Sequence, residues 1–234
     1  MTSETFVIDP TYYGFPDVGH GGYVSGILAG EAMPVAEITL RATPPLGVPL
    51  EIARDGDRVT LTGDDGLIAS VRAVSFDLEL PEPPTPEEAE EASGRCIAHE
   101  RPFCPTCMVC GPARAPGEGL RILPGPVDGR ALVAGPWTPD SFSLGEDNHV
   151  RVEFLWAALD CPGWYALTAG EELRPMVTGR ITGQVVRRPA ADEKLVVIGW
   201  PIVARGRKMV SGTAVFSASH GACAFARSVW FDAV

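Results

Sequence analysis

A match between two distant segments constrains the fold more than any other feature of this sequence. Residues 66–77 (GLIASVRAVSFD) align without gaps with residues 221–232 (GACAFARSVWFD), at an offset of 232 − 77 = 155. Gly, Ala, Arg, Val, Phe and Asp coincide between the two segments. Self-similarity of this kind indicates an internal repeat. We therefore predict one fold used twice as a pseudo-dimer, because a symmetric dimer surface is self-complementary and the fusion of two copies preserves it. We expect the helices that begin near Gly22 and Val152 to pack side by side, each wrapped by its own half of one continuous sheet.

The patterns around each repeated segment predict a helix followed by a meander of antiparallel strands. Asp-Gly turns at 55–57 and 64–66 separate apolar runs, which is typical of hairpins. The first helix begins at a Gly pair and stops before Pro34, and the second spans 151–167 with an interruption at a Pro-Gly pair. The predicted strands span 35–43, 48–54, 58–62 and 67–80 in the first copy, and 129–134, 177–187, 195–204, 208–217 and 222–233 in the second.

The stretch between the two copies has a different composition. Residues 81–95 are acidic and proline-rich without apolar periodicity, which is typical of a linker, with at most a short helical turn at its acidic end. An irregular cysteine-rich segment follows. The predicted domains are a first repeat at 1–80, the linker and Cys-rich segment at 81–118, and a second repeat at 119–234.

Composition and charge exclude several function classes. The 234 residues are 45% hydrophobic and carry a formal net charge of −11, which fits a globular protein and not a general nucleic-acid binder. No apolar run approaches the roughly 18 residues of a membrane span, and the N-terminus does not resemble a signal peptide. Six cysteines are too few for a disulfide scaffold. We therefore expect a cytoplasmic protein with reduced thiols and no membrane partner.

The stretch His20-Gly21-Gly22 leads into small and apolar residues and predicts the start of a mostly buried helix. Backbone N–H groups at a helix start are unpaired and lie at the positive end of the helix dipole, so they favour an anion. An oxyanion hole is built in this way. A Gly-rich turn before a core helix is the simpler interpretation of the same residues.

A helix wrapped by an antiparallel sheet, used twice, resembles the hotdog fold, and short motifs extend the likeness. Residues 21–26 (GGYVSG) resemble the Gly-Gly-x-Val-x-Gly stretch of acyl-CoA thioesterase II-type double-hotdog enzymes, and residues 157–165 (AALDCPGWY) resemble their second-helix segment. His20-Gly21-Gly22 is also similar to the His-Gly-Gly of phenylacetyl-CoA-type thioesterases. The resemblance implies an α+β class: two tandem hotdog folds, each a long helix wrapped by an antiparallel sheet, forming an intrachain pseudo-dimer.

The same resemblance implies one composite active site. In the phenylacetyl-CoA type a catalytic Asp lies nine residues after the His, but here nine residues after His20 stands Ala29, and nine before Asp160 stands Arg151. In hotdog dimers one helix supplies backbone donors and the other supplies the carboxylate. Gly21 and Gly22, next to His20, would then hold the thioester oxygen, and Asp160 would act as general base or as nucleophile.

Other residues near these motifs extend the predicted site and leave alternatives open. We expect the aromatic residues Tyr23, Trp156 and Trp164 to contact the substrate. Asp160 with a following proline is also typical of a helix N-cap. Further candidate carboxylates are Glu31 and Glu153, whose spacing matches neither motif.

One position departs from the family that the chain resembles. That family carries a Gln in its final strand which helps to hold the water, whereas the aligned position here is Arg227, with Arg72 at the matching place in the first copy. Arg at both places favours a structural ion-pair role. The departure puts the water-holding network in question, and with it hydrolysis.

The cysteine-rich segment reads Cys104-Pro-Thr-Cys107-Met-Val-Cys110-Gly. Thiols spaced in this way can bind Zn²⁺, which needs four ligands, and Cys96 or His99 could complete the set. No second C-x-x-C pair follows, so the strong zinc-ribbon spacing is missing. We favour a compact turn with buried thiols and assign neither a metal nor a cofactor.

A basic region late in an acidic chain indicates where a polyanionic ligand could bind. We expect the phosphates of coenzyme A, or the acidic surface of an acyl carrier protein, near a group of five residues: Arg187, Arg188, Arg205, Arg207 and Lys208. Solvated charges at strand ends are the simpler interpretation.

The predicted activity is hydrolysis of acyl-CoA or acyl-carrier thioesters. A hotdog dehydratase or lyase that uses His20 and Asp160 as an acid–base pair is the first alternative, and a non-catalytic acyl-binding protein is the second. Because hotdog units commonly assemble further, we expect a homo-oligomer.

Overall fold

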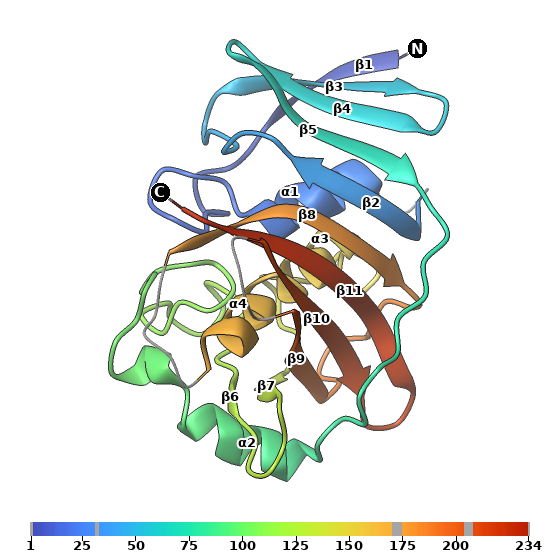
Figure 1. The fold of residues 1–234 in the computed structure, drawn as a ribbon. Coiled ribbons are helices and arrows are strands. Elements are labelled where there is room, and N and C mark those ends of the chain that lie inside the picture. Colours follow the sequence, from blue (N-terminus) through green and yellow to red (C-terminus); the bar gives the residue numbers. More distant parts are fainter. Residues whose placement is uncertain (1, 31–32, 170–174, 204–207, 234) are drawn as a thin grey trace.

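A computed structural model describes residues 2–30, 33–169, 175–203 and 208–233. Within these ranges the chain forms a single eleven-stranded sheet, in the order β1-β3-β4-β5-β2-β8-β11-β10-β9-β7-β6 (Figure 1). All its neighbouring strands run antiparallel. The strands are β1 (Thr2–Val7), β2 (Val35–Leu40), β3 (Pro49–Asp55), β4 (Arg58–Gly63), β5 (Gly66–Ala73), β6 (Gly125–Pro126), β7 (Val133–Trp137), β8 (Met176–Val185), β9 (Leu195–Val203), β10 (Lys208–Ser217) and β11 (Gly221–Asp232).

The two halves of the chain meet at the centre of this sheet. β2 from the first half pairs with β8 from the second, with Ile38 opposite Ile181 and both side chains fully buried. The strands from one half lie on one side of this pair and those from the other half lie on the other side. The prediction of one continuous sheet shared by both halves is confirmed.

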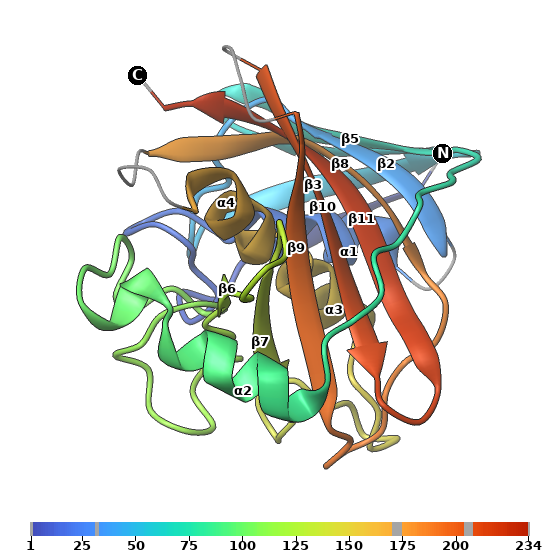
Figure 2. The same cartoon turned by 60° about the horizontal axis from the view of Figure 1, so that its bottom comes forward.

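The sheet is strongly curved and wraps around the central helices (Figures 1 and 2). These are α1 (Gly21–Ala29), α3 (Val152–Ala158) and α4 (Cys161–Thr168). α1 and α3 pack side by side, as predicted, because two glycines of α1 let the backbones approach. A Cβ at Gly22 would stand 2.6 Å from the carbonyl oxygen of Trp156, and one at Gly26 would overlap the Cα of Glu153. These contacts show that α1 and α3 run antiparallel.

The helices differ from the predicted long elements. α1 ends at Ala29, before Pro34, because Gly30 adopts a positive φ of 57°. The second predicted helix is two helices, and the break falls at Leu159 and Asp160, upstream of the expected Pro-Gly pair. Pro162 lies in the first turn of α4, where its missing N–H costs no helical hydrogen bond.

The predicted linker contains a helix, α2 (Pro86–Gly94). Thr85 and Glu88 form a capping box at its start, in which each side chain accepts the backbone N–H of the other residue. Its alanines Ala89 and Ala92 are fully buried, and the helix packs on the β7 end of the sheet (Figure 2). A 3₁₀ turn, η1 (Ile97–His99), follows.

Strand boundaries agree with the sequence in the second half better than in the first. β10 has the predicted bounds, whereas β5 ends at Ala73, seven residues before the predicted end at 80. The predicted strand at 129–134 is replaced by β6 and β7, on either side of a turn. No helix among the described residues is long and apolar enough to cross a membrane.

Candidate functional site

A cavity of about 590 Å³ lies where the start of α1 meets the start of α4. Its wall is mostly apolar and includes aromatic side chains from four separate segments. Asp160, His20 and Gly21 reach it together with several thiols. The main apolar lining residues are Phe15, Val18, Leu40, Phe103, Trp164, Tyr165, Met176, Val177, Trp230 and Phe231.

Asp160 is the carboxylate of this cavity and is only 6% exposed. Its Oδ2 accepts the backbone N–H of Gly22 at 3.0 Å, and its Oδ1 accepts the hydroxyl of Thr178 at 2.6 Å. The backbone of Asp160 stands at the N-cap position of α4, but its side chain makes no capping hydrogen bond there. The side chain of Asp160 therefore points to the other helix and not to its own, which the capping alternative does not explain.

His20 begins α1 and is 3% exposed. Its Nδ1 accepts the N–H of Tyr23 at 3.3 Å as an N-cap, and it lies 3.8 Å from Oδ2 of Asp160. Its Nε2 lies 3.3 Å from Sγ of Cys161. Burial lowers the pKa of His20, but interactions with Cys107 and then Asp160 outweigh it, so the pKa stands above its ordinary value.

The two glycines after His20 have different environments. Gly22 is buried between the helices, and its N–H is occupied by the carboxylate of Asp160. Gly21 lines the cavity, and its N–H has no acceptor in the described part of the chain. Of the two predicted oxyanion donors, Gly21 is therefore the one that can face a ligand, while Gly22 holds the carboxylate.

The three aromatic residues that we expected to contact the substrate also lie in different environments. Trp164 lines the cavity and packs against Phe103. Tyr23 and Trp156 lie outside the cavity lining. Tyr23 stacks on Tyr12 at 4.5 Å, and Trp156 is fully buried at the glycine contact between α1 and α3. We assign these two residues to packing, a role that apolar patterning cannot distinguish from ligand contact.

The cysteine-rich segment folds against the same site. Cys107 lies with its Sγ 3.8 Å from Sγ of Cys161, and Cys110 interacts with both thiols. Hydrogen bonds from Cys110 and then Cys161, together with His20, hold the pKa of the Cys107 thiol well below its ordinary value despite burial. The pKa values of Cys110 and Cys161 are raised, in each case first by Cys107.

The residues that we expected beside these thiols lie elsewhere. Cys104 lines the cavity, and burial raises its pKa to about 12. Cys96 is buried, and burial raises its pKa to about 11. His99 bonds through Nε2 to the carbonyl of Ser93. His20 and Cys161 accompany Cys107 instead, and they are 141 residues apart in sequence, so spacing could not indicate them.

Glu153 and the two aligned arginines lie outside the cavity lining. Glu153 pairs with Arg151 at 3.3 Å, at the start of α3. Glu31 lies outside the described residues. Arg72 pairs with Glu37 at 2.7 Å, as expected for a structural arginine. Arg227 instead lies over the ring of Phe76 at 5.5 Å and points outward, whereas its neighbour Ser228 is buried.

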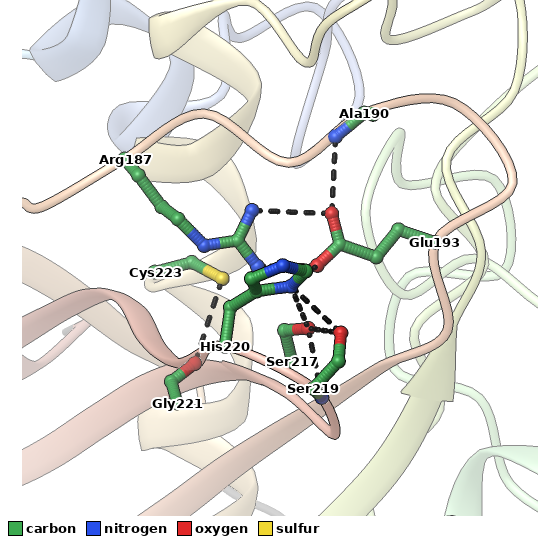
Figure 3. Close-up of polar contacts among 8 residues, drawn as sticks. All are labelled: Arg187, Ala190, Glu193, Ser217, Ser219, His220, Gly221 and Cys223. Carbon is green, nitrogen blue, oxygen red and sulfur yellow. Dashed lines mark hydrogen bonds and ion pairs between the residues drawn. The ribbon is translucent and has the colours of Figure 1, made fainter.

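Two of the five residues that we expected to bind phosphates are instead bonded within the protein, so the prediction is corrected for them. Arg187 makes a two-pronged ion pair with Glu193, which also accepts the N–H of Ala190 (Figure 3). Arg188 bonds to Asp147 and to the carbonyl of Val150. Both side chains are therefore engaged within the protein. Arg205 and Arg207 lie outside the described residues.

Basic residues at the cavity form a different group. Lys208 of the predicted patch lines the cavity together with Arg41 and Arg180, and all three are exposed. Arg180 also lies 3.9 Å from Glu37. Arg41 and Thr178 were not predicted as site residues, and Arg180 was expected only as one charge of the late basic region. Strand alternation could have placed Thr178 on a face, but not beside a carboxylate 18 residues earlier.

Comparisons with known proteins agree with the fold. No protein-family model and no curated protein matches the sequence. Among solved structures, the TesB protein of Mycobacterium avium subspecies paratuberculosis superposes with a TM-score of 0.63 at 13% identity, over 99% of this chain and 93% of that one. The acyl-CoA thioesterase II TesB2 of Mycobacterium marinum does so with 0.61 at 14% identity, over 99% and 93%. With its antiparallel sheet and few helices, the chain has a hotdog-type fold.

Proposed function

We propose that this protein hydrolyses acyl thioesters. The observation that carries the proposal is the carboxylate of Asp160 in the wall of a mostly apolar cavity, held by the N–H of Gly22 and the hydroxyl of Thr178. Two hydrogen bonds fix both carboxylate oxygens, and each oxygen keeps a free lone pair. The solved structure from Mycobacterium marinum that shares this fold is named an acyl-CoA thioesterase II, which agrees with this activity.

The chemistry follows from these positions. Asp160 takes a proton from a water molecule, and Thr178, whose own proton is committed to Oδ1, can accept the second hydrogen of that water. The water oxygen attacks the thioester carbon, the C–S bond breaks, and Asp160 returns its proton to the leaving sulfur, so that a carboxylic acid and a thiol are released. The free N–H of Gly21 is the donor for the carbonyl oxygen as it gains negative charge.

The cavity also indicates the two parts of the substrate. Its aromatic and aliphatic wall suits an acyl chain, which gains from leaving water. Arg41, Arg180 and Lys208 suit the phosphates of a carrier such as coenzyme A, or acidic groups of a carrier protein. This basic group replaces Arg187 and Arg188 in our proposal.

We further propose that the fold is a tandem pair of hotdog units. Each half has the order strand, helix, then four antiparallel strands: β1-α1-β2-β3-β4-β5 in the first and β7-α3-α4-β8-β9-β10-β11 in the second. The spatial order of the strands is mirrored about the central pair β2 and β8. α2 and the segment after it then connect the units. We also propose self-association of the chain, which a sedimentation mass above 24.8 kDa would support.

Hydrolysis is favoured over the lyase alternative by the position of His20. Its Nδ1 caps α1 and its Nε2 faces Cys161, so both ring nitrogens have partners within the protein. A histidine in these contacts positions the start of α1 next to Asp160. An acid–base pair acting across a substrate would need a ring nitrogen directed at the substrate.

The test is release of free thiol from acyl-CoAs of increasing chain length. Asp160→Asn keeps the shape of the side chain, and we expect a loss of about 10²–10⁴ in kcat, the range for removal of a general base. Asp140→Asn is the matched control, since Asp140 also accepts a backbone N–H but does not line the cavity. Wild-type turnover that survives Asp160→Asn, or no turnover with any acyl-CoA or acyl carrier substrate, would contradict the proposal.

A further inference from the structure

A cluster of metal-binding side chains lies beside Asp160, and the hydrolysis proposed above does not use its thiols. Within the described part of the chain, His20, Cys107 and Cys161 form the one group whose ligand atoms all lie within 4.8 Å of one another. His20 and Cys107 are 3% and 2% exposed. Cys110, also buried, interacts with both other thiols. The Sγ of Cys110 is thus close to both other thiols, although it lies outside the 4.8 Å group that includes His20.

The distances in this cluster match those around a tetrahedral zinc ion. With Zn–S bonds of about 2.3 Å and a Zn–N bond of about 2.0 Å, tetrahedral geometry places two sulfurs about 3.8 Å apart and a sulfur about 3.5 Å from the nitrogen. Sγ of Cys107 and Sγ of Cys161 are 3.8 Å apart, and Nε2 of His20 is 3.3 Å from Sγ of Cys161. These three ligand atoms need little movement to surround an ion, whereas the side chain of Cys110 must move closer to His20 to complete the set.

The loop that carries Cys107 and Cys110 is shaped to present thiolates. The two cysteines have the C-x-x-C spacing of structural zinc sites. The N–H of Val109 donates to Sγ of Cys107 at 3.4 Å, and such a bond favours the ionised sulfur. Gly111 closes the turn, since its N–H donates to the carbonyl of Cys107 at 3.0 Å and a Cβ there would stand 2.6 Å from the Cys107 nitrogen.

We propose that one Zn²⁺ ion binds here through Nε2 of His20 and the thiolates of Cys107, Cys110 and Cys161. This is a Cys₃His set, which is typical of closed structural sites. The three thiols release their protons to solvent on binding. Nε2 gives its lone pair to the ion, so the proton of the neutral ring moves to Nδ1, which then no longer accepts the N–H of Tyr23.

This tautomer couples the ion to the candidate active site. Oδ2 of Asp160 lies 3.8 Å from Nδ1, so a small approach of the two side chains on metal binding would let the protonated Nδ1 donate to it, as in the carboxylate–histidine–zinc arrangements of metalloproteins. The ion joins the start of α1, the start of α4 and the loop at 104–111. It thereby fixes the wall from which Asp160 and Gly21 face the cavity.

The first experiment measures metal bound to the intact protein. Protein purified under reducing conditions from zinc-supplemented cells, without chelator, is expected to contain about one Zn²⁺ per chain. Cys107→Ser and Cys161→Ser are expected to lose it. Cys104→Ser is the matched control, because Cys104 lies in the same segment and lines the same cavity but is not one of the four proposed ligands, and it should keep the ion.

The second experiment does not depend on the folding of any variant. Chelator-treated, reduced wild-type protein is titrated with Co²⁺, which is expected to give the strong visible absorption of a tetrahedral site and thiolate-to-cobalt charge transfer, saturating at one equivalent. Zn²⁺ should abolish both signals. Cys110→Ser should weaken the charge-transfer band, because it removes one of three thiolates.

Several results would overturn the inference. The first is the absence of both zinc in the isolated protein and a tetrahedral cobalt spectrum. The second is a Cys107–Cys161 disulfide that persists in protein purified with a reductant, which would indicate redox chemistry. The third is an acyl group carried by Cys107 in metal-free, active protein, since the thiol would then be a nucleophile.

Discussion

At the scale of single residues, the site depends on one carboxylate that receives hydrogen bonds from two distant segments. Gly22 approaches Asp160 from the other half of the chain and Thr178 approaches it from β8. Together they fix both the position of the carboxylate and the direction of its free lone pairs. The proposed hydrolysis therefore depends on residues that hold the base as well as on the base.

Thr178→Val tests this dependence. Valine has nearly the shape of threonine but cannot donate to Oδ1, and a hydrogen bond to a charged group contributes about 1.5–3 kcal/mol. We expect kcat to fall by about ten- to a hundredfold with KM little changed. Thr39→Val is the control, since Thr39 lines the same cavity from β2. A raised KM at unchanged kcat would instead make Thr178 a substrate contact.

Glu193 gives a second prediction at this scale, because Arg187 lowers its pKa to about 2, from an ordinary value of 4.5 (Figure 3). A carboxylate whose folded pKa is depressed stabilises the fold above its unfolded pKa and loses that stability as pH falls. Glu193→Gln should lower the free energy of unfolding by about 1–2 kcal/mol at pH 7.

The difference between wild type and Glu193→Gln should shrink as the pH falls from 4.5 to 2. Chemical denaturation at a series of pH values measures it. Glu51→Gln, at an exposed position of β3, provides the comparison. A pH-independent difference would show that the side chain stabilises by packing and not by charge.

At the scale of elements, the close approach of α1 and α3 brings the two halves of the site together. The glycines of α1 at 22 and 26 face the backbone of α3, and a side chain at either place would meet main-chain atoms that cannot turn aside. Since α1 and α3 run antiparallel, the start of α1 lies at the end of α3, where Asp160 follows. The helix spacing and the geometry of the site are therefore linked.

Gly26→Ala should separate these helices. Overpacking of this kind costs about 1–3 kcal/mol, and the bond between Gly22 and Asp160 should lengthen, so activity per folded molecule should fall too. Gly94→Ala is the control, because a Cβ at Gly94, the last residue of α2, meets no atom within 4 Å. Thermal unfolding with an activity assay checks both. Equal melting temperatures for the two variants would refute this role of Gly26.

At the scale of the whole molecule, the distribution of charge matters more than its sum. The net charge of −11 repels a polyanionic substrate, so local positive charge is needed to attract one. The exposed Arg41, Arg180 and Lys208 supply it at the cavity. The ion pairs of Arg187 and Arg188 do not, because their charge is balanced within the protein.

Substitution of Arg41 and Lys208 by alanine tests this arrangement. We expect a severalfold rise in KM for acyl-CoA at low ionic strength, nearly unchanged kcat, and a difference that declines as salt screens the charges. Arg58→Ala and Arg95→Ala, which remove two positive charges away from the cavity, form the matched control. An equal rise in KM in both double variants would show that the effect comes from the net charge of the protein and not from the position of Arg41 and Lys208.

The sequence by itself determined the elements and their repetition. The match between residues 66–77 and 221–232 predicted two copies, and both segments begin a strand with glycine at positive φ, at Gly66 and Gly221. Apolar alternation and Asp-Gly turns depend on neighbours a few residues away, so β3, β4 and β10 could be predicted closely. The Gly pair of α1 and Asp160 could be proposed together only through the resemblance to a known family.

Only the tertiary structure decided which residues meet. Thr178 of β8 bonds to Asp160 before α4, and Cys161 joins Cys107 because the 104–111 loop folds back on the helices. For the same reason, only the structure shows that Tyr23 and Trp156 are core residues and that Arg187 forms an ion pair. Burial and side-chain contacts arise from packing between segments far apart in the chain. Local sequence patterns depend only on nearby residues, so they cannot predict which distant segments pack together.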